Sequence, residues 1–165
     1  MKPIVAASLI ALVSAYASPV AASCQDPRLS DIQLNTVLSG NTVCGRPIMP
    51  AEGGGYPGNP NDRWQEEHQG AAPGGALWDY KKGNPPAETV DPRKQVGTWA
   101  IITIAPGVYG VRHTYLDGAY FDWTVHSIPP AANNRYSFCA RTTEFARGKV
   151  KPGINVGCAA GDFPP

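Results

Sequence analysis

The sequence predicts an all-β protein: a single antiparallel β-sheet domain, folded as a small open barrel or a sandwich, with one short N-terminal helix. Short stretches rich in aromatic and β-branched residues recur along the chain, and Gly- and Pro-containing turns separate them. No helix-length pattern lies between these stretches, which argues against parallel βαβ units. Four cysteines in a chain that begins with an export signal favour a disulfide-linked domain.

Residues 1–22 have the pattern of a cleavable signal peptide. Lys2 supplies a positive charge, residues 4–13 form an apolar run, and small residues lead up to Ala22. We therefore expect an exported protein, periplasmic or extracellular, whose single domain covers residues 23–165.

Two alternatives to a cleaved signal peptide remain open. Residues 4–13 also suit a buried N-terminal helix, although the run is too short to span a bilayer. The second alternative is a lipid anchor at Cys24, although Ala21 stands where lipid-attachment sites usually carry Leu.

The charge balance argues against one class of partner. The chain has 14 Lys and Arg against 13 Asp and Glu, and Lys2 is one of the basic residues. Binding to nucleic acid through its phosphates needs a basic excess on one face, which this composition does not supply. No segment after the signal peptide is apolar enough to cross a membrane. We expect neither a nucleic-acid partner nor a transmembrane segment.

All four cysteines follow the signal peptide, and an even number in an exported chain predicts two disulfides. Three connectivities are open. The two sequence-local pairs, Cys24–Cys44 and Cys139–Cys158, are the favoured ones. The chain contains no C-x-x-C motif, which argues against zinc-ribbon, thioredoxin-type and c-type haem sites.

Residues 29–40 carry the helix signal. Ser30 and Gln33 form a capping-box pattern at the start, and Gly40 suits the end. Leu34 and Leu38 share one face, which predicts a short helix that plugs or flanks the sheet.

The remainder of the chain predicts strands and one long loop. A strand begins at residues 42–44, and residues 45–61 are dense in Gly and Pro, as in a surface loop. The later strands are expected at residues 63–69, 76–82, 97–104, 108–116, 119–128 and 135–140, with a last one at 154–158.

Asp117-Gly118 predicts a hairpin with a two-residue type I′ turn. In that register His113 faces Asp122 and Arg112 faces Trp123, while Phe121, Trp123 and Val125 point to the core. The other face then carries an accessible polar and aromatic set: Tyr109, His113, Tyr115, Tyr120, Asp122 and His126. A three-residue turn with a bulge would shift this register.

Four short motifs carry a resemblance to known proteins. The order LSGNTV (38–43), GTW (97–99), YSFC (136–139) and GC (157–158) resembles small exported bacterial β-domain proteins of unassigned function. That resemblance implies a compact β-sheet domain with an N-terminal signal, and it brings no catalytic residues with it. The GTW motif alone is also similar to the first strand of lipocalins and avidins, where it sits near the start of the barrel.

Two groups of residues suggest chemistry. His113 opposite Asp122 is either an oriented general base or a cross-strand polar pair, and no G-x-S-x-G nucleophile accompanies it. Glu66, Glu67 and His68 could join His113 and His126 around a metal, but the short fixed spacings of metal sites are absent. We expect no metal and no cofactor. On an alternating strand, Glu66 and His68 share a side with Trp64 while Glu67 points away.

Aromatic residues are the most suggestive feature of the composition. We expect Trp99 and Trp123 in the core and Tyr109, Tyr115 and Tyr120 on an accessible face.

The favoured function is an exported non-enzymatic binding or structural module. Its partner is an unknown small ligand, glycan or protein, engaged through the aromatic sheet face defined by the hairpin. One alternative is a small periplasmic or secreted hydrolase or lyase that uses His113 or His126. A second is an enzyme inhibitor that acts through the loop at residues 45–61.

Overall fold

The computed structural model describes residues 24, 27–48, 63–79 and 93–164. The predicted signal peptide and most of the predicted loop at residues 45–61 lie outside this description. In the part that is described, no helix is both long and apolar enough to cross a membrane.

The predicted helix is confirmed as α1, Asp31–Leu38. The Ser30 side chain accepts a hydrogen bond from the Gln33 amide, and the Gln33 side chain accepts one from the Ser30 amide, so both halves of the capping box form. Leu34 and Leu38 are fully buried. The helix therefore packs against the rest of the protein through the face that its sequence predicts.

The strands form one closed antiparallel barrel in chain order, from β1 to β8 and back to β1. This corrects the expectation of an open barrel or a sandwich. The strands are β1 Asn41–Pro47, β2 Trp64–His68, β3 Gly74–Asp79, β4 Lys94–Ala105, β5 Val108–Tyr115, β6 Tyr120–Ser127, β7 Arg135–Ala140 and β8 Thr143–Pro152.

Closure depends on β8, which the sequence did not predict. It pairs with β7 on one side and with β1 on the other, from Asn41↔Pro152 to Pro47↔Ala146. The predicted strand at residues 154–158 is wrong, because that segment follows β8 without joining the sheet. β1 also continues to Pro47, so the predicted loop starts later than residue 45.

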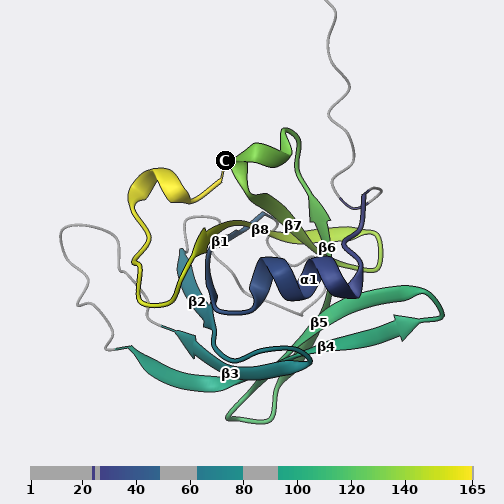
Figure 1. The fold of residues 1–165 in the computed structure, drawn as a ribbon, viewed down its shortest axis with the longest axis horizontal. Helices are drawn as coiled ribbons and strands as arrows, with labels where there is room; N and C mark the ends of the chain where they lie inside the picture. Colours follow the sequence, from purple (N-terminus) through teal and green to yellow (C-terminus); the bar gives the residue numbers. More distant parts are fainter. Residues whose placement is uncertain (1–23, 25–26, 49–62, 80–92, 165) are drawn as a thin grey trace, which may run out of the picture.

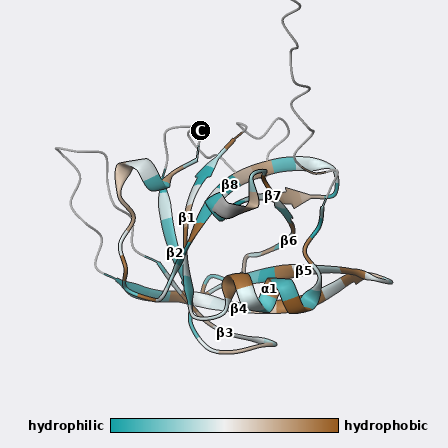
Figure 2. Cartoon of the chain, turned by 45° about the horizontal axis from the view of Figure 1, so that its top comes forward, coloured by the Kyte–Doolittle hydropathy of each residue, from teal (hydrophilic) through white to brown (hydrophobic). Residues whose placement is uncertain are grey.

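Hydrophobic and hydrophilic residues alternate at short intervals along the strands (Figure 2), as expected for a sheet with one buried side. The apolar side points into the barrel. Leu34 and Leu38 of α1 join the core there, and α1 lies across the ring of strands (Figure 1). The strand residues of this core are Val43, Leu77, Trp99, Val111, Val125, Phe138, Ala146 and Val150.

The β5–β6 hairpin has the shifted register. His113 lies opposite Phe121 and Arg112 opposite Asp122, one residue away from the predicted pairing. The turn is longer than two residues: the Tyr115 amide donates to the Ala119 carbonyl at 2.8 Å, and Gly118 takes a φ of +87°. A one-residue shift exchanges the partners of every side chain.

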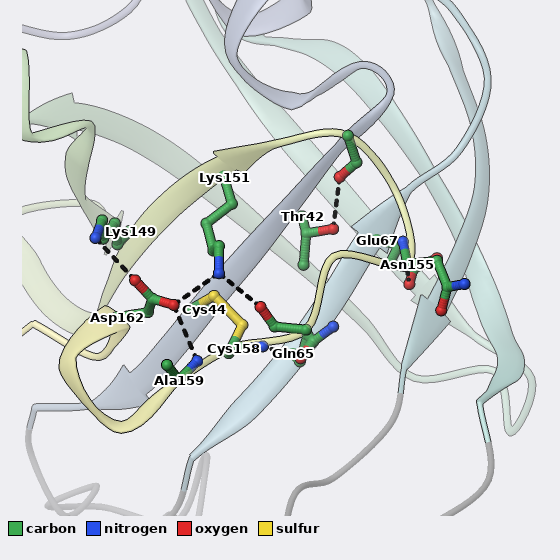
Figure 3. Close-up of a disulfide and its surroundings, with 12 residues drawn as sticks. Thr42, Cys44, Gln65, Glu67, Lys149, Lys151, Asn155, Cys158, Ala159 and Asp162 are labelled. Carbon is green, nitrogen blue, oxygen red and sulfur yellow. Dashed lines mark hydrogen bonds and ion pairs between the residues drawn. A yellow bond between two sulfur atoms is a disulfide. The ribbon is translucent and has the colours of Figure 1, made fainter.

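Both disulfides form, but the predicted local pairing is wrong. Cys24 is bonded to Cys139 and Cys44 to Cys158, with sequence separations of 115 and 114. Cys24 lies in the segment before α1, and Cys158 lies in the segment after β8. The N-terminal segment bonds to β6, where the Leu29 amide donates to the Val125 carbonyl at 2.9 Å. The C-terminal segment folds back over β1 and β2 (Figure 3).

Candidate functional site

A cavity lies inside the barrel. The empty space amounts to about 570 Å³, its opening to solvent included. Pro47, Trp64, Tyr115 and Phe121 stand at strand ends away from α1, so the cavity occupies the part of the barrel that the helix does not fill. The lining residues are Val43, Pro47, Trp64, Glu66, His113, Tyr115, Phe121, Trp123, Phe138, Phe145 and Ala146.

Aromatic rings form most of the cavity wall. Phe121 and Trp123 are stacked, with centroids 5.7 Å apart, and Trp123 also contacts Phe145 at 5.7 Å. The indole of Trp64 lies directly against Gly45, where any side chain would collide with it. The glycine therefore makes room for a ring on the inner side of β1.

A chain of four polar side chains runs from the cavity toward the core. The Tyr115 hydroxyl donates to Glu66 Oε1 at 2.6 Å, and Glu66 Oε2 lies 3.6 Å from His113 Nδ1. His113 Nε2 in turn lies 3.0 Å from His68 Nε2. Glu66, His113 and His68 are 6%, 3% and 0% exposed, so the chain is buried.

Burial sets the protonation of this chain. It penalises the charged form of Glu66 and raises the pKa of that carboxyl, and hydrogen bonds from Tyr115 and Trp64 offset this only in part. Burial lowers the pKa of His113 to about 4. The pKa of His68 is well below its ordinary value because of burial and the neighbouring His113. Both imidazoles are therefore neutral at neutral pH.

The tautomers follow from the hydrogen-bond partners. The Nδ1 atom of His68 has no hydrogen-bond partner among the residues that the structure describes. A buried unpaired N–H is rarer and more unfavourable than an unpaired lone pair, so His68 carries its proton on Nε2 and donates to His113. The proton of His113 then sits on Nδ1 and faces the Glu66 carboxylate.

The structure separates the residues that the sequence placed on one face. His113 and Tyr115 line the cavity, and Tyr109 packs against the core. Tyr120 is 60% exposed on the outside.

The predicted pairing of His113 with Asp122, as an oriented base or as a cross-strand polar pair, is wrong, because Asp122 lies opposite Arg112. Asp122 forms an ion pair with Arg112 at 2.6 Å instead. His126 is buried elsewhere, with Nε2 3.0 Å from Thr124 Oγ1 and its backbone bridged to Arg28. Neither residue reaches the cavity lining.

Two residues of the cavity, Glu66 and Trp64, were not assigned to a site from the sequence. The alternation along β2 correctly placed Trp64, Glu66 and His68 on one side and Glu67 on the other. The missing signal is the contact between Glu66 and Tyr115, which spans 49 residues and exists only because the sheet closes.

The lining offers limited chemistry. The lining residues that the structure describes include no Ser, Thr or Cys that could act as a nucleophile. Over the same described ranges, no group of three or more His, Cys, Asp or Glu side chains is arranged to hold a metal ion. The cavity is suited to holding a molecule with apolar surface and one polar group.

No protein-family model, curated protein or solved structure matches the chain. The geometry of the cavity therefore carries the functional argument.

Proposed function

We propose that this is an exported, non-enzymatic binding protein that holds a small, largely apolar ligand inside its barrel. The observation that supports this is the internal cavity, which six aromatic side chains and one buried carboxyl group line. Ligand sites in proteins are typically concave and mainly apolar, with a few polar groups that orient the ligand. The two disulfides support the periplasmic or extracellular compartment.

The enzymatic alternative has weaker support. A general base works best when its pKa lies near the operating pH, and burial lowers the pKa of His113 to about 4. The lining also supplies no nucleophile among its described residues. The proposed ligand binds inside the barrel and not on the aromatic sheet face, because Tyr120 and Asp122 point away from the cavity.

Tryptophan fluorescence provides the test, because Trp64 and Trp123 line the cavity. The disulfide-intact protein is titrated with small ring compounds such as toluene, indole and naphthalene. We expect saturable binding that Ala146→Phe abolishes, because the new ring occupies the cavity.

Trp78→Phe is the matched control, because Trp78 lies on the outside of the barrel beneath Arg93. This variant should bind as the unaltered protein does. Absence of saturable binding, or binding that Ala146→Phe leaves intact, contradicts the proposal.

A further inference from the structure

The charges inside the cavity are unbalanced. Glu66 is the one acidic residue of the lining, and the lining residues in the described ranges include neither Lys nor Arg. His113, the nearest titratable base, is neutral at neutral pH because burial lowers its pKa to about 4. Among the lining residues that the structure describes, an ionised Glu66 therefore has hydrogen-bond partners but no positive counter-charge.

The surroundings of Glu66 favour a cation. A buried carboxylate is stabilised when an opposite charge approaches within a few ångströms. The faces of aromatic rings also attract cations, and Trp and Tyr do so most strongly. Trp64 and Tyr115 both hydrogen-bond to Glu66, so the carboxylate and two such rings lie together.

We infer that the ligand is an organic amine whose ammonium group binds Glu66 between the aromatic side chains of the cavity. This inference rests on the proposed function and names the chemical class of its ligand. The apolar part of the amine contacts Phe121, Trp123 and Phe145, and the ammonium donates hydrogen bonds to the carboxylate.

Binding of this kind is coupled to protonation. The neighbouring strands present Asp79 of β3 and Val43 of β1 beside Glu66. The other titratable groups that face it are His113 and Tyr115 of β5 and His68 of its own strand. Only the ionised form of Glu66 can pair with an ammonium. Burial raises the pKa of Glu66, so this form appears at a higher pH than it does for an exposed carboxyl. Amine affinity should therefore rise with pH through the titration of Glu66.

The experiment compares three molecules that share a phenylethyl group and differ in charge: phenethylamine, n-propylbenzene and hydrocinnamate. Affinities are measured by calorimetry or tryptophan fluorescence on the disulfide-intact protein at neutral pH. We expect phenethylamine to bind about ten-fold or more tightly than n-propylbenzene, and hydrocinnamate to bind weakest. As the pH rises through the titration of Glu66, only the amine affinity should increase.

Glu66→Gln keeps the size of the side chain and removes its charge. It should weaken phenethylamine binding about ten-fold or more and leave n-propylbenzene binding unchanged. Tyr115→Phe should weaken amine binding less, and it serves as a second variant if Glu66→Gln does not fold. Glu67→Gln, one residue along on the outer side of β2, is the matched control and should leave the amine preference intact.

The outcomes separate the two ideas. Equal affinity for phenethylamine and n-propylbenzene, or an amine preference that survives Glu66→Gln, overturns the inference while the proposed function stands. If none of the three molecules binds, both the proposed function and the inference are contradicted.

Discussion

Glu66 and Glu67 are neighbours on β2, yet the barrel wall places them in opposite environments. Both are buried, at 6% and 0% exposure. For Glu67, burial alone would raise the pKa, but Arg93, Gln69 and the Asn155 amide all donate to its carboxylate and lower the pKa instead. For Glu66, two neutral donors do not outweigh burial, and the pKa is raised.

A second carboxylate on the outer side of the barrel, that of Asp162, follows the pattern of Glu67 (Figure 3). Lys149 and Lys151 both bond to Asp162 at 2.8 Å, and their hydrogen bonds hold the pKa of that carboxyl far below its usual value. Gln65 Oε1 accepts a hydrogen bond from the Cys158 amide at 2.8 Å, beside the disulfide to Cys44.

The comparison teaches how to distinguish a structural polar group from a functional one in this fold. Outside, the carboxylates of Glu67 and Asp162 are already paired with Arg93 and with Lys149 and Lys151, so their charge is balanced without a ligand. Inside, the carboxyl of Glu66 accepts hydrogen bonds from the neutral side chains of Tyr115 and Trp64 and lines the cavity. A buried titratable group with an unbalanced charge in a cavity is a candidate for function.

The largest effect on stability should come from removing the disulfide on the outer side of the barrel. Replacing Cys44 and Cys158 together with Ala should lower the free energy of unfolding by about 2–5 kcal/mol, because the bond closes a long loop in the unfolded chain. Urea denaturation measures this. Ligand affinity of the folded fraction should persist, because the cavity lies on the other side of the strand.

The second disulfide is the control for this experiment. Cys24–Cys139 closes a loop of nearly equal length on β7, so its loss should be similar in size. Loss of ligand binding by the Cys44–Cys158 variant while it remains folded would show that the two sides of the wall are not independent.

The next effect is a dependence of stability on pH that the inner histidines cause. The pKa of His113 falls from 6.5 in the unfolded chain to about 4 in the folded protein, so the unfolded state binds more protons below pH 6.5. Stability should therefore fall by roughly 3 kcal/mol as the pH drops from 6.5 through 4. His113→Gln should flatten this slope in denaturant unfolding measured at several pH values.

The carboxyl groups act in other pH ranges. Glu67 and Asp162, whose pKa values are lowered, contribute stability above their ordinary values that is lost as the pH falls through the lowered ones. Glu66, whose pKa is raised, acts in the opposite sense. Its contribution to stability is present below pH 4.5 and is lost as the pH rises through the raised pKa. A slope between pH 6.5 and 4 that is as steep in His113→Gln as in the unaltered protein would contradict the role given to His113, because His68 contributes only the remainder.

Local features of this fold were predictable from the sequence, whereas features that depend on closure were not. The capping box at Ser30 lies within four residues, and every strand except β8 has a predicted counterpart. β8 alternates Arg147, Lys149 and Lys151 with small inward residues, a composition typical of a charged loop. That segment is a strand because it pairs with β1 and β7.

The same limit applies to the site and to the disulfides. Alternation alone correctly placed Trp64, Glu66 and His68 on one side of β2. The hairpin register depended on the turn, and Asp117-Gly118 suits both a two-residue and a longer turn because Gly118 takes a positive φ in either. The disulfides join the ends of the chain to the barrel, and no local spacing encodes that contact.

A smaller effect should separate the two glutamates themselves. Glu67→Gln should lower the free energy of unfolding by about 1–3 kcal/mol, because Arg93 loses its charged partner. Glu66→Gln should change it by about 1 kcal/mol or less, because the loss of an ionised acceptor is offset by removing a charge that burial penalises. Chemical denaturation at neutral pH measures both, and the opposite ranking would contradict the comparison.

The smallest effect concerns the two tyrosines that the sequence placed on one face, Tyr115 and Tyr120. Tyr120 is on the outside, with Arg112 over its ring at 4.6 Å, so Tyr120→Ala should change stability by about 0.5 kcal/mol or less and leave ligand affinity unchanged. Tyr115→Phe removes a single hydroxyl, yet it should weaken ligand binding, because that hydroxyl donates to Glu66 at the cavity wall. Parallel titrations of the two variants with phenethylamine measure the difference. If Tyr120→Ala weakened binding more than Tyr115→Phe, the ligand would bind the outer sheet face, and the interior of the barrel would have only a structural role.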